Sequence, residues 1–227
     1  MDKKPLVVAN WKATKTIKET IDWVKAAKSK LEGLTGVEVV ICPSFTSLPF
    51  IASLFKGTSI KIGAQNVSHY PEGAYTGEVT AKMLDGLVDH CLVGHSERRK
   101  NFAETNEQIN QKVSLLSEYG IKSIVCISNI DEVNSLVNNK NKIEAVAYEP
   151  LFAIGSDKPD TPENASKMAV SIKKILGEGI KVIYGGSADP NNVASFTKEE
   201  NINGVLPGRA SWQPEIFLSL LDNIIHN

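Results

Sequence analysis

Short apolar runs alternate with longer amphipathic stretches along most of the chain. Eight runs rich in small and β-branched apolar residues have the length and composition of buried strands. They cover residues 6–9, 37–41, 59–64, 91–93, 122–127, 145–148, 180–184 and 204–206. Between them, helical patterns with an apolar residue at every third or fourth position cover residues 16–31, 105–119, 162–176 and 214–225. This alternation predicts an α/β fold, a closed (β/α)₈ barrel.

The ends of the predicted helices agree with this pattern. Thr161-Pro162-Glu163 has an N-cap residue, a proline at the first helical position and an acid in the first turn, while Gly120 and Gly177 end two helices. No low-complexity segment or long linker divides the chain. The 227 residues, 42% of them hydrophobic, are enough for one core, so we expect a single domain spanning residues 1–227.

The amino-acid composition limits the kinds of molecule that the protein is expected to bind. The 25 basic and 26 acidic residues nearly cancel, so no strong field attracts nucleic acid or an anionic membrane surface. The apolar stretch at residues 5–9 is too short for a signal peptide or a membrane anchor. The three cysteines, Cys42, Cys91 and Cys126, form no CxxC pair and lie in apolar runs, which is typical of a reduced, cytoplasmic protein.

A histidine and a glutamate each follow a predicted strand directly. His95 lies in GHSERR, residues 94–99, and Glu149 lies in AYEPLFAIG, residues 147–155. The carboxyl ends of parallel strands form the ligand-binding edge of such barrels, so this pair indicates proton-transfer chemistry. A helical turn after His95 would favour a neutral imidazole, because its positive end faces the ring. The alternatives are a buried structural histidine and an ordinary ion-pair carboxylate.

Other polar residues at the same edge suit an anionic ligand. Asn10 and Lys12 follow the first strand, and the alternative for Lys12 is a solvated loop lysine. Glu97 and Arg98 are candidates for holding Lys12 in place, although a surface charge run has the same composition.

Glycine turns follow the seventh and eighth strands, as YGGSA at 184–188 and LPGRAS at 206–211. Loops at these positions are the recurrent phosphate site of (β/α)₈ barrels. The segment AIGSDK after Glu149 has the composition of a lid. The four histidines lack zinc-binding spacing, and neither GxGxxG nor GxxxxGK[ST] occurs, so we expect no metal and no cofactor.

In combination, ANWK, GAQN, GAYTGE, GHSERR, AYEPLFAIG and YGGS resemble the triosephosphate isomerase family along the whole chain. The resemblance implies a TIM barrel and cofactor-free interconversion of dihydroxyacetone phosphate and D-glyceraldehyde 3-phosphate through an enediolate, in glycolysis and gluconeogenesis. It makes Glu149 the general base and His95 the neutral electrophile. The further roles it implies are Lys12 for the enediolate and phosphate charge, Asn10 for positioning, Gly155, Ser187 and Gly208 for phosphate, and Tyr184 for the closed lid.

The resemblance also implies a homo-oligomer. Tyr75 and Thr76 at the tip of the loop 66–77 resemble the interdigitating loop of the family, and Glu78 and Arg98 are candidates for the same interface. A dimer is the default expectation. Residues 129–142 leave room for only a small fifth helix, as in compact archaeal members, so a tetramer is the second possibility.

Four departures from the family pattern leave the proton-transfer residues intact. Arg209 stands where a second glycine is usual, with Pro207 just before it; SDKPD forms the end of the lid; Phe152 replaces a hinge tryptophan; and Asn129 replaces a glutamate. We expect the Arg209 side chain to turn outward, because Lys12 and backbone N–H groups already serve the phosphate site. Two other functions remain open: a phosphate-binding barrel enzyme of amino-acid biosynthesis, and a barrel that has lost catalysis and acts as a scaffold.

Overall fold

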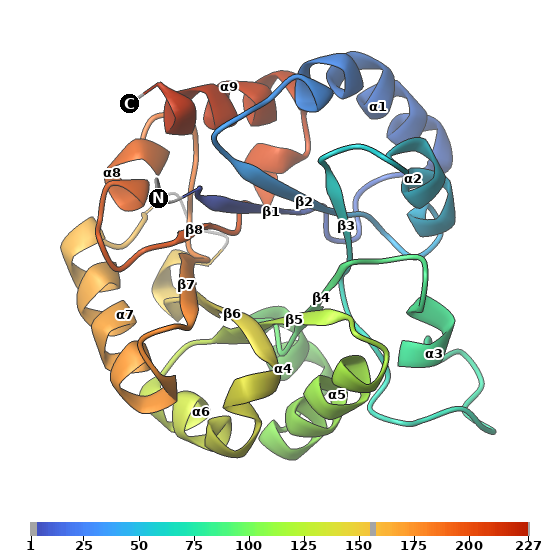
Figure 1. Cartoon of the computed structure of the whole chain (residues 1–227), viewed down its shortest axis with the longest axis vertical. Helices are drawn as coiled ribbons and strands as arrows, with labels where there is room; N and C mark the ends of the chain where they lie inside the picture. Colours follow the sequence, from blue (N-terminus) through green and yellow to red (C-terminus); the bar gives the residue numbers. More distant parts are fainter. Residues whose placement is uncertain (1–3, 155–157, 227) are drawn as a thin grey trace.

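Eight parallel strands close into a barrel surrounded by helices (Figure 1). The computed structural model describes residues 4–154 and 158–226. The strands are β1 (Leu6–Asn10), β2 (Glu38–Cys42), β3 (Lys61–Ala64), β4 (His90–Val93), β5 (Lys122–Ile127), β6 (Ile143–Tyr148), β7 (Lys181–Tyr184) and β8 (Gly204–Val205). Each pairs in parallel with its neighbours in chain order, and β1 pairs with β8. The predicted (β/α)₈ barrel is confirmed.

The helices form the outer ring in Figure 1. They are α1 (Ile17–Glu32), α2 (Leu48–Leu54), α3 (Ala81–Leu84), α4 (Ser96–Phe102), α5 (Asn106–Glu118), α6 (Ile130–Ser135), α7 (Pro162–Leu176), α8 (Val193–Thr197) and α9 (Pro214–Ile225), with 3₁₀ turns η1 (Val137–Lys142), η2 (Leu151–Ala153) and η3 (Arg209–Ser211). The four long predicted helices are α1, α5, α7 and α9. The others are too short for a helical period to be visible in the sequence.

Local signals explain where the predicted helices begin and end. The Thr161 side chain caps α7 by accepting a hydrogen bond from the backbone N–H of Asn164. Gly120 and Gly177 follow α5 and α7 with φ values of 67° and 118°, conformations that favour glycine. The predicted small fifth helix is the six-residue α6, followed by η1. Within residues 4–154 and 158–226, no helix is both long and apolar enough to cross a membrane.

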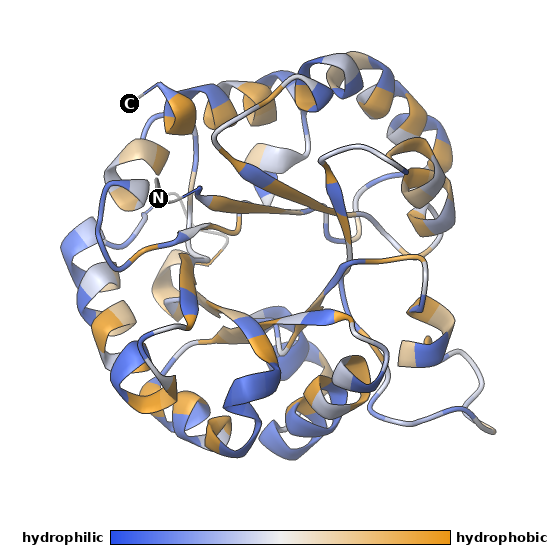
Figure 2. Ribbon diagram, viewed as in Figure 1, coloured by the Kyte–Doolittle hydropathy of each residue, from blue (hydrophilic) through white to orange (hydrophobic). Residues whose placement is uncertain are grey.

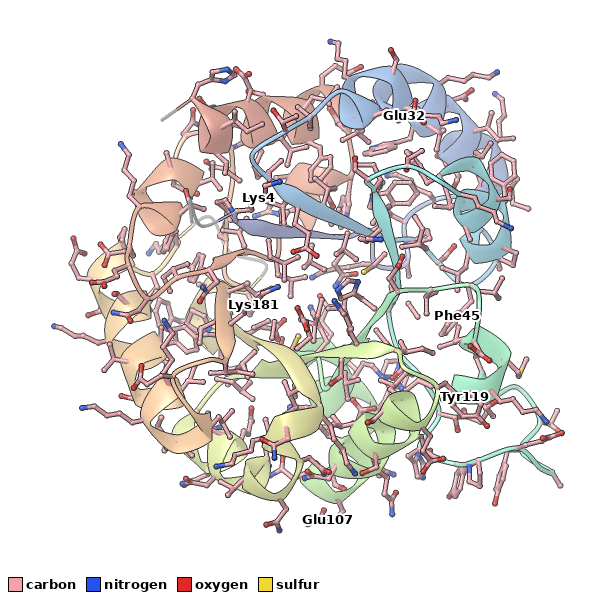
Figure 3. All side chains as sticks on the ribbon, viewed as in Figure 1. Lys4, Glu32, Phe45, Glu107, Tyr119 and Lys181 are labelled. Carbon is pink, nitrogen blue, oxygen red and sulfur yellow. The ribbon has the colours of Figure 1, made fainter. Side chains whose placement is uncertain are left out.

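Alternating side chains of the strands build two apolar cores. Val7 and Ala9 of β1 face the helices, whereas Leu6 and Val8 face the barrel interior. In Figure 2 the strands at the centre are largely apolar, and the surrounding helices alternate between apolar and polar residues. Figure 3 shows that side chains fill the space that appears open between the ribbons. The interior is therefore a packed core, and a ligand can bind only at its ends.

The barrel closes where β8 meets β1, through only two residue pairs, Leu6 with Gly204 and Val7 with Val205. Gly204 has φ 153°, and a Cβ atom there would lie 1.9 Å from the Leu6 carbonyl oxygen. The strands can approach this closely only because residue 204 has no side chain.

We predict that Gly204→Ala lowers the free energy of unfolding by about 3 kcal/mol, because the added methyl group pushes β8 away from β1. Denaturant unfolding followed by circular dichroism measures the change. Gly179→Ala is the matched control, since a Cβ at Gly179 would meet nothing within 4 Å. Equal stability of the two variants would contradict the closure argument.

His90 lies at the amino-terminal end of β4 and is 1% exposed, and neither ring nitrogen has a hydrogen-bond partner in the described part of the chain. Burial lowers its pKa, and the charge of Lys122 lowers it further against the opposing carboxylates of Glu38, Asp89 and Glu144. Glu144 in turn pairs with Lys181, labelled in Figure 3, at 2.7 Å. His90 is therefore buried in its neutral form.

This burial predicts a loss of stability in acid. Because the pKa of His90 is lower in the folded than in the unfolded chain, the unfolded chain takes up the proton first as the pH falls. The contribution of His90 to the free energy of unfolding is therefore complete above about pH 6.5. Below that pH it is lost, by at most about 1.4 kcal/mol per pH unit. We expect unfolding free energies of His90→Leu to fall less steeply than wild type between about pH 7 and pH 5. His226→Leu, at a side chain 69% exposed, should keep the wild-type slope.

Candidate active site

The polar residues predicted for one edge of the barrel meet around a single cavity. Asn10, Lys12 and His95 form one wall of a cavity of about 320 Å³. Ile154 and Pro159, from the two described ends of the β6–α7 loop, form another. The rest is lined by Gly185, Gly186, Ser187, Ala188, Asp189, Leu206, Gly208, Arg209, Ala210 and Ile216. Because all strands of the barrel are parallel, the loops that follow them bring segments from both halves of the chain to one site.

Lys12 is held in a strained backbone conformation, with φ 51°. Its backbone N–H donates to Asn10 Oδ1 at 3.0 Å, and its carbonyl accepts a hydrogen bond from Gln65 Nε2 at 2.8 Å. Lys12 Nζ lies 2.5 Å from Glu97 Oε1, as expected for a residue that holds the lysine. Gln65 was missed as a site residue, although its position directly after β3 is the signal that could have found it.

Arg98 does not contact Lys12 in the structure, which corrects the expectation that it helps to hold the lysine. It turns to the other side of α4, where Nε lies 3.4 Å from Glu104 Oε1. Glu104 is buried and also pairs with Lys112. The buried negative charge attracts Arg98 away from the cavity, because an unpaired buried carboxylate is costly.

The hydrogen bonds of His95 define its tautomer. The ring lies at the N-terminus of α4, and Nδ1 accepts a hydrogen bond from the backbone N–H of Glu97 at 3.2 Å. Because a backbone N–H can only donate, Nδ1 carries no proton, and a neutral ring has its proton on Nε2. Nε2 lies 3.2 Å from Glu149 Oε1. This arrangement leaves an N–H donor at the cavity edge, as the neutral-imidazole hypothesis requires.

Glu149 is fully buried and lies behind His95 rather than on the cavity wall. Its Oε2 accepts a hydrogen bond from the backbone N–H of Ser96 at 2.8 Å. Cys126 is the other neighbour: burial raises the pKa of its thiol well above the usual range, and the charge of Glu149 and a hydrogen bond to it raise it further. Cys126 was predicted only as a core thiol. Its inward-facing position near the end of β5 is the signal for a contact with the site.

The turns after β7 and β8 form the opposite side of the cavity. Asp189 accepts hydrogen bonds from the N–H groups of Asn191 and Asn192, and Asn192 Nδ2 donates to the Ser187 carbonyl at 3.1 Å. A Cβ at Gly208 would lie 3.2 Å from Lys12 Cε, so this turn approaches the lysine closely. These turns present backbone groups and the Lys12 charge to one space, which suits a phosphate group.

The structure also places the remaining predicted residues. Arg209 borders the cavity with an exposed side chain, and Tyr184 Oη accepts a hydrogen bond from the backbone N–H of Asp160 in the β6–α7 loop. Gly155 lies outside the described residues. Tyr75, Thr76, Glu78 and Arg98 line a second cavity of about 280 Å³ beside α4 and α5.

Known proteins resemble this chain over nearly its full length. A family model described as "Triosephosphate isomerase" matches residues 5–224. The chain belongs to the triosephosphate isomerase family. A triosephosphate isomerase of Dictyoglomus thermophilum is 37% identical, covering 96% of this chain and 99% of the relative. Those of Aquifex aeolicus and Endomicrobium trichonymphae are 36% and 35% identical and cover 95% and 96% of this chain.

Membership of the triosephosphate isomerase family confirms the resemblance seen in the motifs and the assignment of the chain as an isomerase. The matching family is one of isomerases rather than of phosphoribosyl-binding biosynthetic enzymes. Its name implies triose phosphate as the class of substrate.

Proposed function

We propose that this isomerase interconverts dihydroxyacetone phosphate and D-glyceraldehyde 3-phosphate through an enediolate, without a cofactor, in glycolysis and gluconeogenesis. The observation that carries the proposal is the pairing of His95 Nε2 with Glu149 Oε1 at 3.2 Å beside a cavity that Lys12 borders. A base, a neutral N–H donor and a fixed cation together supply what enediolate formation requires.

In the proposed reaction Glu149 removes a proton from C1 of the ketose, and the electron pair forms the C1–C2 double bond. His95 donates a hydrogen bond from Nε2 to the developing oxyanion and moves protons between the two oxygens. Glu149 then returns its proton to C2, which gives the aldose. Lys12 offsets the negative charge of the enediolate and the phosphate, and Asn10 positions the substrate.

The buried position of Glu149 implies a movement during the reaction. Its carboxylate must release the hydrogen bond from the Ser96 N–H and move to a position over the substrate. The movement is short, because Glu149 Oε1 already lies 3.2 Å from His95 Nε2 at the cavity edge. Closure of the β6–α7 loop would remove water, and this makes the carboxylate a stronger base and protects the enediolate from losing phosphate.

The phosphate group would lie against the turns after β7 and β8, with Gly155, Ser187 and Gly208 as donors. We further propose that residues 1–227 form one domain of a cytoplasmic homo-oligomer. Three buried free cysteines support a reducing compartment.

A coupled assay tests the function. Purified protein receives dihydroxyacetone phosphate in buffer without metal or nucleotide, the reaction is stopped, and the aldose formed is then measured with an NAD-dependent dehydrogenase. We expect turnover without an added cofactor, abolished by Glu149→Gln. Absence of interconversion at any enzyme concentration would overturn the proposal.

Glu149→Asp tests the base. The shorter side chain keeps the charge but withdraws the carboxylate, so we predict that kcat falls by about 10²-fold while KM changes far less. Steady-state kinetics in both directions measures the effect, and circular dichroism verifies the fold. Wild-type turnover in this variant would exclude Glu149 as the base.

Arg209→Gly tests whether the exposed guanidinium binds phosphate. We predict that KM stays within a few-fold of wild type, because Lys12 and the backbone donors of the turns suffice. Kinetics at low ionic strength gives the strongest test, since a charge-assisted contact is least screened there. A tenfold or larger increase in KM with little change in kcat would show that the side chain binds phosphate.

Exposed apolar side chains support a homo-oligomer formed through the loop 66–77. Tyr70 and Tyr75 stack at 4.1 Å, and Met83 and Phe102 nearby are 58% and 67% exposed. Such a cluster is typical of a subunit interface. We predict a dimer, or a tetramer if η1 adds a second interface, measured by light scattering.

Thr76→Glu places a charge at the loop tip and should shift the protein toward monomers with reduced turnover. Lys174→Glu, on the exposed face of α7, is the control and should leave the mass unchanged. A wild-type protein that is fully active as a monomer would contradict the interface.

A further inference from the structure

Arg99, the last residue of the GHSERR motif, is a charged residue of α4 that lies outside the lining of the active-site cavity. Its side chain is only 15% exposed. Burial of a guanidinium is costly unless its N–H groups find acceptors, because the group cannot lose its charge by giving up a proton. The acceptors that Arg99 binds therefore show which parts of the chain it holds together.

Two of these acceptors are backbone carbonyl oxygens at the ends of the neighbouring strands β4 and β5 (Figure 1). Arg99 Nε donates to the Gly94 carbonyl at 2.9 Å, and Nη2 donates to the Cys126 carbonyl at 3.2 Å. The pairing of β4 with β5 ends one residue earlier on each strand, at Val93 and Val125. One guanidinium thus joins the two chains at the first position beyond the strand pairing.

Gly94 explains why a side chain makes this connection in place of the strand pairing. Its φ value of 72° turns the chain out of β4, in a conformation that favours glycine. A Cβ atom there would lie 3.2 Å from Arg99 Nη2 and 2.8 Å from Ile109 Cδ1. The guanidinium therefore packs against the glycine at the point where the chain turns toward His95.

Two further contacts hold the guanidinium from the side of the helices. Nη1 donates to Asn106 Oδ1 at 2.7 Å, at the start of α5. The Glu132 carboxylate of α6 lies 3.6 Å from Nε and also accepts a hydrogen bond from the Ser128 N–H at 2.7 Å. The planar guanidinium is thus held by acceptors on two strand ends and two helices, which the single ammonium group of a lysine could not bind together.

The β4 side of this connection carries the proposed electrophile. Gly94 directly precedes His95, whose Nε2 lies 3.2 Å from Glu149 Oε1. The next residue, Ser96, donates its N–H to Glu149 Oε2 at 2.8 Å. The turn that Arg99 holds therefore contacts both oxygens of the Glu149 carboxylate.

The β5 side of the connection holds the backbone of Glu149. Ile127, which follows Cys126, accepts a hydrogen bond from the Glu149 N–H at 2.7 Å. The carboxylate of Glu149 is therefore held from the end of β4, and its backbone is held from the end of β5. The spacing of these two strand ends sets the position of Glu149 relative to His95.

We infer that Arg99 is a positioning residue for the isomerisation: by joining the ends of β4 and β5, it fixes the distance between His95 and Glu149. This inference rests on the proposed function. Without the guanidinium, the carbonyls of Gly94 and Cys126 lose a donor, and the β4–α4 turn can shift relative to β5. A displacement of about 1 Å between reacting groups can cost on the order of 10²-fold in turnover.

Kinetics of Arg99→Met tests the inference. The methionine side chain keeps apolar bulk but has no N–H donor. We expect kcat to fall about tenfold while KM stays within about twofold of wild type. Inhibition by inorganic phosphate, which reports on the turns after β7 and β8, should be unchanged, because those turns form the opposite side of the cavity.

Two control variants separate positioning from a loss of stability. Asn106→Ala removes one acceptor of the guanidinium but leaves its bonds to both strand carbonyls. It should lower the melting temperature with kcat within about twofold of wild type. Lys100→Met makes the same change of charge at an exposed position of α4 and should leave both quantities unchanged.

Recovery of activity gives a second measurement. Arg99→Lys keeps the charge but cannot bind both carbonyls, so its kcat should lie between those of Arg99→Met and wild type, and it carries the test if Arg99→Met does not fold. In Arg99→Ala, millimolar guanidinium chloride should raise kcat, because the free ion can enter the vacated space and bind the two carbonyls. Sodium chloride at the same ionic strength should have no such effect.

The outcomes separate the two proposals. If wild-type protein interconverts the triose phosphates but the folded variants at Arg99 keep the wild-type kcat, the inference is wrong and the proposed function stands. The inference is also wrong if Asn106→Ala lowers kcat as much as Arg99→Met, since a loss of stability would then explain both. If wild-type protein shows no interconversion, the proposed function fails, and the inference fails with it.

Discussion

The site depends on the closure of the parallel barrel between β8 and β1. Only two residue pairs make this junction, and the approach of Gly204 to the Leu6 carbonyl is possible because residue 204 has no Cβ. Closure places the carboxyl ends of the strands at one edge, and segments that follow β1, β4, β6, β7 and β8 line the cavity there. Asn10 at the end of β1 thereby comes into the same cavity as Gly208 beyond β8, although nearly the whole chain separates them.

At that edge, the first turn of α4 arranges the proposed catalytic groups. Its N–H groups engage the ring of His95 and the carboxylate of Glu149, so one short helix fixes a tautomer and holds the proposed base. Glu97 from the same turn pairs with Lys12. The free energy needed to orient these groups is supplied when the protein folds. This is the general basis of electrostatic preorganisation in enzymes.

Two of the four departures from the family pattern, Phe152 and SDKPD, lie in the β6–α7 loop that borders this cavity. Asn129 serves a neighbouring helix and Phe152 lies exposed. The attachment of the loop is instead made at its far end, where Asp160 meets Tyr184. A buried hydrogen bond at this point restricts the backbone of the returning end of the loop.

The pattern of apolar residues was enough to predict the fold, because eight short apolar runs with four long helical patterns between them leave few other ways to bury that much apolar surface. The strand-end positions of His95, Glu149 and Lys12 were equally visible, since residues that follow parallel strands meet at one edge. The partner of Arg98 and the contact of Cys126 with Glu149 were decided only by tertiary structure. Both depend on which buried charge lies opposite the side chain, and that charge comes from another segment of the chain, which local sequence does not identify. Asp160 is the clearest case: in sequence it is one polar residue in a loop, and only the folded barrel brings its N–H to the hydroxyl of Tyr184.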